Sequence, residues 1–528
     1  MRTRKFVSAS FLSAVLIAAS AFAQQPKHLF FRVTAGPEIT SPVSGRLLIF
    51  LSAGKGATKV DLNEFHPTST YVAAKEISDL KPGASVDIDT DDAVFPEPFS
   101  SLKPGDYQAQ AVLDVGHTYA YSGRTSGDYI SEVVTLSAWT PDSGPEPQLT
   151  LSDIVPPRTL PKGTPEQEAA AHREEMQSAV LTEFWGRPMF VRAWVILPPG
   201  YQAHGKTRYP TVYWTHGFGG NMLYAKFFGE RVYSRMAEKK MPPMIWVMLD
   251  ESLPTGTHEF ADSVNDGPWG EALTKEFIPY LEARYRMDAR ASGRFLQGHS
   301  SGGWATLQLQ VNYPRMFGGT WSTSPDPSDF HNFTGPDLYA PHANVYRRPD
   351  GSPYPLIRDH GKVIATFEQF AKLEQVLGPY GGQMASFEWV FSPRGKDGRP
   401  EKMFDRATGD VNPAVVAYWR EHYDLAHLCQ ADWKERGPYL KGKIHVFVGT
   451  ADTFYLDGAA HKFDAVLQSL HADAHFTFIP NRTHFDLYNV GNDRMGLMDE
   501  IAAQMWAVAR PDSASSDTRL RRHSAARH

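Results

Sequence analysis

A serine flanked by glycines lies at 298–302, in a segment that reads Gly-His-Ser-Ser-Gly. It directly follows a short strand-like run at 294–297 and precedes a helical run at 304–311. A strand, a tight turn and a helix in this order hold a serine hydroxyl clear of the backbone, where it can attack a carbonyl carbon. Glycines are expected here because the turn is strained and the helix packs close to the strand. The pattern predicts Ser300 as the nucleophile of an acyl transfer.

A base and an acid are expected after the last two strands. His484 follows the strand predicted at 476–479, and Asp452 follows the strand predicted at 444–448. Imidazole can take the proton of a serine hydroxyl and return it to a leaving group, while a carboxylate fixes the tautomer and orientation of the ring. The chain order Ser300, Asp452, His484 suits this chemistry. Weaker alternatives are Asp457 for the acid and His461 or His475 for the base.

Acyl transfer also needs N–H donors for the oxyanion that forms at the carbonyl. The loop at 216–220 reads His-Gly-Phe-Gly-Gly and follows a buried-type strand at 211–215. We expect one donor to be the backbone N–H of Phe218 in this loop. The other is expected from Ser301, at the start of the helix after the nucleophile. Glycine-rich loops also close turns without a ligand, so this loop predicts an oxyanion site only in combination with the serine turn at 298–302.

The chain from 176 to 510 alternates strand, loop and helix, which predicts an α/β catalytic domain with a mostly parallel sheet. Strands are predicted at 191–197, 211–215, 243–249, 294–297, 318–322, 444–448 and 476–479, and helices at 271–285, 304–311 and 495–509. The stretch 324–441 matches none of these strands and holds helices near 364–377 and 413–428. An insertion at this place is expected to form a lid or a substrate-binding wall.

Residues 24–140 read as short strands separated by turns such as Lys-Pro-Gly at 81–83, which predicts an N-terminal all-β, sandwich-like domain. This domain either binds glycan or braces the catalytic domain. Residues 141–175 are rich in Pro, Ser, Gly and Thr, which is typical of a linker. Residues 511–528 contain few apolar side chains, and a disordered tail is expected there.

The first 23 residues have the features of a signal peptide. A positive start is followed by a mostly apolar run at 6–19 and by Ala-Phe-Ala at 21–23. We therefore expect a periplasmic or secreted protein whose mature chain starts near Gln24. No other stretch of about 18 apolar residues occurs in the sequence, so no integral membrane span is expected.

Composition excludes other classes of function. The chain has 528 residues and a net charge of −6, which gives no sign of a nucleic-acid partner. Cys429 is the sole cysteine, so no intramolecular disulfide can form, and its surroundings do not resemble a catalytic thiol motif. Nothing has metal-ligand spacing, and dinucleotide and nucleotide fingerprints are lacking, so neither a metal nor a cofactor is expected. The oligomeric state is left open.

With these motifs the sequence resembles the α/β-hydrolase branch that groups esterase D, feruloyl esterases, enterochelin esterases and secreted mycolyltransferases. The resemblance covers about 185–320 and 440–508, and rests on the segments at 214–220, 298–303 and 481–484. The segment 260–270 looks like that of large secreted bacterial members with an N-terminal β domain. In the family, the loop after the fourth strand lines the cleft. The resemblance therefore implies an α/β-hydrolase fold and substrate contacts at Asn265 and Trp269, although a Gly-Pro-Trp turn can be purely structural.

Together, these features predict a secreted serine carboxylic ester hydrolase that works through an acyl-enzyme. Its expected partner is a small-molecule or carbohydrate ester with an acyl or aryl group, such as acetyl or feruloyl. One alternative is an acyltransferase that passes the acyl group to a sugar or lipid alcohol. Another is a glycan-binding protein in which the hydrolase domain is a passive scaffold. The fold does not decide the substrate.

Overall fold

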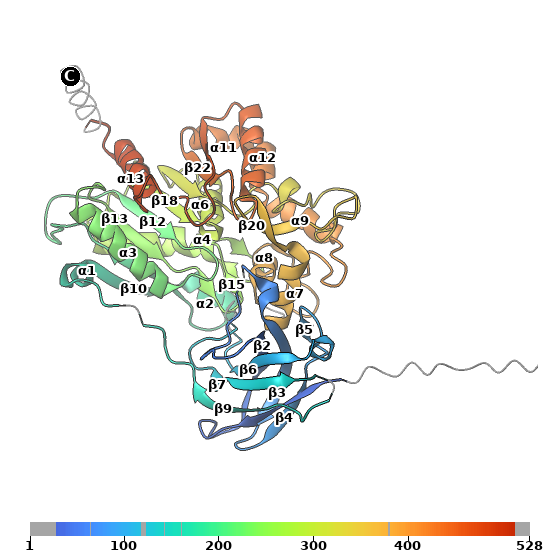
Figure 1. Ribbon diagram of the computed structural model, residues 1–528. Coiled ribbons are helices and arrows are strands. Elements are labelled where there is room, and N and C mark those ends of the chain that lie inside the picture. The colour runs from blue at the N-terminus through green and yellow to red at the C-terminus, as the bar shows by residue number, and fades with distance from the viewer. Residues whose placement is uncertain are drawn as a thin grey trace, which may run out of the picture.

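The computed structural model describes residues 28–63, 65–117, 123–141, 143–159, 161–378 and 381–512. The predicted signal peptide and all but the first two residues of the predicted tail lie outside these residues. None of the helices in this part of the chain is both long and apolar enough to cross a membrane. Figure 1 shows a strand-rich N-terminal part beside a larger part in which helices flank a sheet.

The N-terminal part is built from nine strands. They are β1 (Phe30–Ala35), β2 (Val43–Ala53), β3 (Tyr71–Leu80), β4 (Ser85–Asp89), β5 (Val94–Phe95), β6 (Gly105–Asp114), β7 (Tyr129–Ser131), β8 (Val134–Trp139) and β9 (Gln148–Ile154). Their order is β4-β1-β9-β7-β6-β2-β3-β5, with β8 also pairing with β6. The sheet folds over on itself, because Phe31 of β1 and Leu151 of β9 share one buried core with Leu47 of β2.

A linker was predicted at 141–175, but strand β9 lies within it. Residues 148–154 instead pair in parallel with β1, where Val33 lies opposite Leu149. Leu149 and Leu151 alternate with polar residues and are both buried. The alternation of apolar and polar residues is short and is flanked by prolines, so the sequence alone indicates a linker. A proline just before a strand is nevertheless compatible with pairing.

The larger part contains an eight-stranded sheet. Its strands are β10 (Ala171–Gln177), β11 (Phe190–Ile196), β12 (Thr211–Thr215), β13 (Ile245–Leu249), β18 (Arg294–His299), β19 (Gly319–Thr323), β22 (Ile444–Gly449) and β23 (Ala474–Ile479). The order is β10-β11-β13-β12-β18-β19-β22-β23, antiparallel up to β13 and parallel from there on. Strands β12, β13 and β19 are buried at every position, as expected for a parallel sheet covered on both faces. This is the α/β-hydrolase fold, and the predicted fold class is confirmed.

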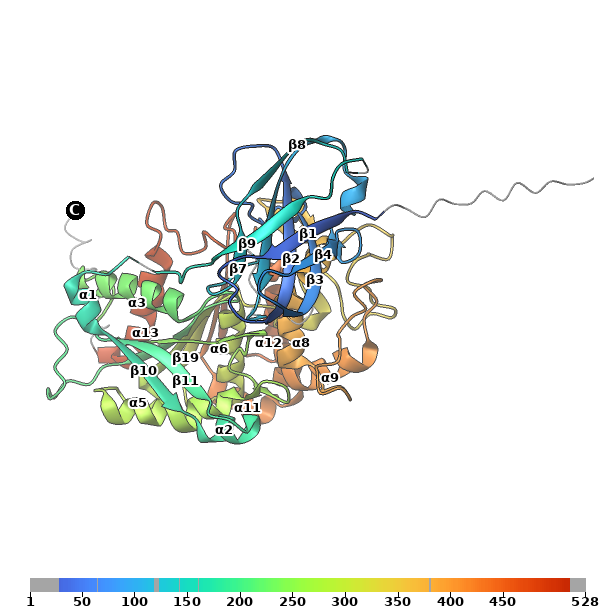
Figure 2. The ribbon, with the colours of Figure 1, turned by 90° about the horizontal axis from the view of Figure 1, so that it is seen from below.

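Helices cover both faces of this sheet (Figure 2). On one face, α3 (Met222–Ala237) and α13 (Gly496–Ala509) pack in a common apolar core with Trp246 of β13. On the other face lies α5 (Ile278–Arg284), which continues α4 (Trp269–Glu271) through a π-helical turn. Helix α6 (Ser301–Asn312) follows β18 and is buried along nearly its whole length. Further helices of this part are α1 (Pro165–Ala170), α2 (Ala179–Trp185) and α12 (Leu456–Ser469).

The insertion at 324–441 joins the two parts of the molecule. It contains β20 (Pro355–Asp359), β21 (Lys362–Thr366), α7 (Phe367–Leu377), α8 (Gln383–Phe391), α9 (Pro413–Tyr423), α10 (Leu425–Ala431) and α11 (Trp433–Leu440). Leu373 of α7 packs in one core with Phe50 and Val72 of the N-terminal sheet. Arg46 of β2 also donates a hydrogen bond to the backbone oxygen of Val376, at 2.8 Å. The N-terminal sheet therefore rests directly on the insertion.

Candidate active site

Ser300 occupies a strained turn between β18 and α6. Its backbone has φ 61° and ψ −125°, a region that costs a residue with a side chain about 1–3 kcal/mol. A Cβ on Gly298 would lie 2.1 Å from the carbonyl oxygen of Gly302. A Cβ on Gly302 would lie 2.4 Å from the carbonyl oxygen of His216. Both glycines are therefore required by close backbone approach, which is the physical reason for the sequence pattern around the serine.

His484 and Asp452 form a buried pair. Nδ1 of His484 lies 2.9 Å from Oδ2 of Asp452, and both side chains are almost entirely buried. The second oxygen of Asp452 accepts hydrogen bonds from the backbone N–H groups of Phe454, at 2.9 Å, and Leu456, at 3.3 Å. Burial opposes ionisation, but His484 and these N–H groups outweigh it and hold the pKa of Asp452 below its ordinary value. The ionised carboxylate fixes the proton of His484 on Nδ1, which leaves Nε2 as the base.

The weaker candidates for the acid and the base, Asp457, His461 and His475, have other partners. The carboxylate of Asp457 binds Arg358, at 2.7 Å. The ring of His461 stacks on Phe478 with centroids 3.6 Å apart, and His475 lies beside Asp473. The structure thus pairs His484 with Asp452 rather than with Asp457.

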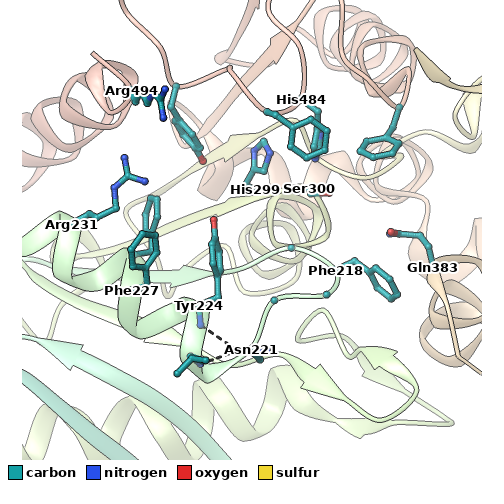
Figure 3. A pocket seen from close by; sticks show the side chains of 18 of the residues that line it. Phe218, Asn221, Tyr224, Phe227, Arg231, His299, Ser300, Gln383, His484 and Arg494 are labelled. Carbon is teal, nitrogen blue, oxygen red and sulfur yellow. Dashed lines mark hydrogen bonds between the residues drawn. The ribbon is translucent and has the colours of Figure 1, made fainter. Parts of the chain in front are cut away.

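Ser300 and His484 line one cavity of about 800 Å³ (Figure 3). The other residues of its lining are Phe65, Arg158, Thr159, Gly217, Phe218, Gly219, Gly220, Asn221, Leu223, Tyr224, Phe227, Phe228, Arg231, His299, Phe370, Gln383, Phe454, Phe485, Tyr488, Asn489, Arg494 and Met495. The ring of His299 lies 4.3 Å from that of His484, centroid to centroid. Burial and the neighbouring His484 lower the pKa of His299 to about 3, so His299 is a neutral wall of the site.

The loop after β12 and the start of α6 supply N–H groups beside Ser300. A Cβ on Gly217 would lie only 3.0 Å from Cβ of Ser300, so the loop touches the nucleophile. Phe218 lines the cavity in the same loop. Ser301 is the first residue of α6, where backbone N–H groups have no acceptor within the helix and the helix dipole favours negative charge. The arrangement suits the stabilisation of an oxyanion.

A buried carboxyl group lies behind this loop. Oδ2 of Asp326 accepts a hydrogen bond from the hydroxyl of Ser301, at 2.6 Å. Burial raises the pKa of Asp326 to about 6.

The structure does not bring Asn265 and Trp269 to the cavity, which corrects the role that the resemblance implied. The side-chain N–H of Asn265 donates to the backbone oxygen of Ser392, at 2.8 Å. The indole N–H of Trp269 donates to the backbone oxygen of Asp266, at 2.9 Å, and its ring stacks on His258. Both side chains are buried. The insertion covers this loop. The polar groups of the loop therefore form hydrogen bonds with the backbone of the insertion and do not face the cavity.

Replacing Asn265 with Ala tests this structural role. We expect a loss of about 1–2 kcal/mol in the free energy of unfolding, because the Ser392 carbonyl loses its donor. The KM for a small ester should stay within about twofold of wild type, since the side chain does not line the cavity. Unfolding in urea and steady-state kinetics measure both quantities. A several-fold rise in KM with unaltered stability would contradict the structural role and indicate that Asn265 contacts the substrate.

Several lining residues could not be predicted from the sequence. Phe65 comes from the N-terminal part, and its ring lies 5.2 Å from that of Phe485, edge to face. Phe485 itself is 63% exposed, although it follows His484 directly. Gln383 comes from the insertion. Only the spacing of Tyr224 and Phe227 on one face of α3 offered a signal, and that spacing equally fits a packed helix face.

Replacing Phe65 with Ala removes the aromatic wall that the N-terminal part contributes. We expect the KM for an aryl ester to rise about threefold to tenfold, because an edge-to-face pair is worth about 0.5–1.5 kcal/mol. Phe30, an exposed ring on β1 outside the cavity, provides the matched control as Phe30→Ala. Steady-state kinetics on methyl ferulate measures the change. Equal KM values for the two variants would exclude a substrate contact at Phe65.

Comparisons with known proteins find one matching family and several similar proteins. The model of a family described as "Putative esterase" matches residues 186–489. Two curated proteins of Mycobacterium tuberculosis, Esterase MT1326 and Esterase Rv1288, are each 31% identical over 136 residues, which is 25% of this chain. The match spans only 28% of the length of either relative.

Solved structures with a similar arrangement include a ferulic acid esterase. It is 14% identical with a TM-score of 0.39, over 64% of this chain and 97% of that chain. An S-formylglutathione hydrolase from Agrobacterium tumefaciens is also 14% identical, with a TM-score of 0.36, over 64% of this chain and 95% of that chain.

Proposed function

Because the chain belongs to the "Putative esterase" family, we propose that it hydrolyses carboxylic esters through Ser300, His484 and Asp452. One observation carries the proposal. A serine with φ 61° shares a cavity with a histidine whose Nδ1 lies 2.9 Å from a buried, ionised aspartate. These are the parts that nucleophilic acyl transfer requires.

The proposed reaction has two halves. In the first, Nε2 of His484 takes the hydroxyl proton as Oγ of Ser300 attacks the ester carbonyl, and the oxyanion is held by the backbone N–H groups of Phe218 and Ser301. The tetrahedral intermediate collapses, His484 gives its proton to the leaving alkoxide, and an acyl-enzyme remains. In the second half, water gives a proton to His484 and attacks the acyl carbonyl. The tetrahedral intermediate then expels Oγ of Ser300, which takes the proton back from His484, and the carboxylic acid leaves.

We propose an exported substrate, an acyl or aryl ester of a carbohydrate or of a small molecule. Support comes from the aromatic lining of the cavity, which includes Tyr224, Phe227 and Phe485. The signal-peptide features of the first 23 residues support a periplasmic or secreted enzyme. N-terminal sequencing of the exported protein should begin at Gln24, and an uncleaved chain retained in the cytoplasm would contradict export.

A substrate panel combined with covalent labelling tests the function. The purified mature protein is assayed on p-nitrophenyl acetate and butyrate, methyl ferulate, acetylated xylan and a triacylglycerol, with and without a sugar acceptor. An organophosphonate should block activity and add one adduct, located on Ser300 by mass spectrometry. Release of free acid supports a hydrolase, whereas acylated sugar supports the acyltransferase alternative. No turnover and no adduct would favour a passive scaffold and contradict the proposal.

A further inference from the structure

The lining of the catalytic cavity is positively charged. It includes Arg158, Arg231 and Arg494, whereas none of its described lining residues is an aspartate or a glutamate. The whole chain, in contrast, carries a net charge of −6. A cavity lined by charges of one sign attracts ligands of the opposite sign.

Two aspartates near Arg231 and Arg494 form ion pairs with a third arginine, Arg235. Arg235 lies one helical turn beyond Arg231 on α3 and forms ion pairs with Asp493, at 2.6 Å, and with Asp499. Asp493 directly precedes Arg494 in the chain, yet its carboxylate faces Arg235. Arg231 and Arg494 form no ion pair with any residue that the structure describes. Two guanidinium groups are thus left without a carboxylate partner at the cavity.

The two arginines line the end of the cavity that lies away from Ser300. Tyr224, Phe227 and Arg231 project from one face of α3, at the i, i+3, i+7 spacing of a helical stripe. The guanidinium of Arg231 lies 5.9 Å from the ring centroid of Phe227. Figure 3 shows Arg231, Phe227 and Tyr224 following one another along α3 toward the side of the cavity that holds Ser300, while Arg494 lies on the same side of the cavity as Arg231. Tyr224 and Phe227 therefore line an arm of the cavity that leads from Ser300 toward Arg231, with Arg494 at the same end.

We propose that this arm binds an anionic group of the ester, so that the preferred substrates carry a carboxylate or phosphate remote from the reacting carbonyl. Arg231 and Arg494 are then residues that determine specificity. A planar guanidinium pairs with such groups through two parallel N–H donors, which a neutral substrate cannot use. The inference rests on the proposed ester hydrolysis for its role in turnover, but the anion site can be tested separately.

Matched pairs of esters test the preference. On the acyl side, the mono-p-nitrophenyl ester of adipic acid is compared with p-nitrophenyl heptanoate. On the alcohol side, 4-acetoxybenzoate is compared with 4-acetoxybenzamide. We expect the ratio of kcat/KM, anionic over neutral, to fall roughly tenfold in the Arg231→Gln/Arg494→Gln variant for at least one pair, mainly through KM. Arg187→Gln, which removes an exposed arginine outside the cavity, should keep the wild-type ratio.

The pair that responds shows whether the anion belongs to the acyl or the alcohol part. Raising the salt concentration should lower the wild-type ratio, because exposed charges are screened. Equal ratios in wild type and in the double variant for both pairs would overturn the inference while leaving ester hydrolysis intact.

Binding without turnover separates this inference from the proposed function. Titration calorimetry of 4-acetoxybenzoate into Ser300→Ala should show binding that the two Arg→Gln changes weaken roughly tenfold. If no ester is hydrolysed but this arginine-dependent binding occurs, the proposed function fails and the anion site stands. Binding that is absent, or that the arginine substitutions do not weaken, would overturn the anion site.

Discussion

Ser300→Ala is expected to lower kcat for p-nitrophenyl acetate by about 10⁴-fold or more, because no other group can form the acyl-enzyme. The fold should survive, since alanine at φ 61° bears the same backbone strain as serine. We therefore expect thermal unfolding within a few degrees of wild type. Stopped-flow release of p-nitrophenol measures the loss, and circular dichroism follows the fold.

Ser301→Ala is the matched control within the same turn. The hydroxyl of Ser301 donates to Asp326, and its backbone N–H, the proposed oxyanion donor, is kept in the variant. Its activity should fall far less than that of Ser300→Ala. Wild-type turnover by purified Ser300→Ala would exclude Ser300 as the nucleophile.

The fold, and the positions of the three residues that we propose to react, could be predicted because each depends on a local pattern. The fully apolar run at 245–249 is short and consists largely of residues that favour strands, which indicates a buried parallel strand. The glycines beside Ser300 are required by backbone contacts within the turn itself and with the neighbouring strand end. Asp452 and His484 each follow a strand directly, and the carboxyl ends of parallel strands meet at one edge of a sheet.

Contacts between distant segments could not be predicted in this way. Whether Asn265 faces a substrate or a carbonyl depends on Ser392, which is 127 residues further along the chain. Phe65 reaches the cavity because the N-terminal sheet packs on α7, and no pattern around Phe65 reveals this. The helix predicted at 413–428 is divided because Asp424 caps α10 by accepting from the N–H of His427. Tertiary packing and a local cap overrode the pattern at these places.

The N-terminal part and the insertion act together on the site. Leu373 and Val376 of α7 hold the N-terminal sheet, while Phe370 of the same helix lines the cavity. A shift of α7 would therefore move a wall of the cavity together with Phe65. The N-terminal part and the insertion thus each add a wall to the cavity, beside the wall that α3 of the α/β core supplies.

Asp452→Asn is expected to lower kcat/KM for p-nitrophenyl acetate by about 10³–10⁴-fold, although the side chain keeps its shape. The amide of asparagine would donate to Nδ1 of His484, which places the ring proton on Nε2 and removes the base from the side of Ser300. It also removes the negative charge that stabilises the imidazolium ion formed during attack. Because Oδ1 accepts from Phe454 and Leu456, the carbonyl oxygen of asparagine is expected to take that place and turn the amide toward His484.

Asp457→Asn is the matched control, since it makes the same chemical change five residues away. Asp457 binds Arg358, whose Nε donates to the backbone oxygen of Asp452, at 2.8 Å. Loss of the ion pair disturbs the acid mainly through this contact, so a loss of activity of about threefold or less is expected. Steady-state kinetics and thermal unfolding of both variants decide between the two carboxylates. Near-normal activity in Asp452→Asn with a large loss in Asp457→Asn would assign the acid to Asp457 and contradict the pairing seen in the structure.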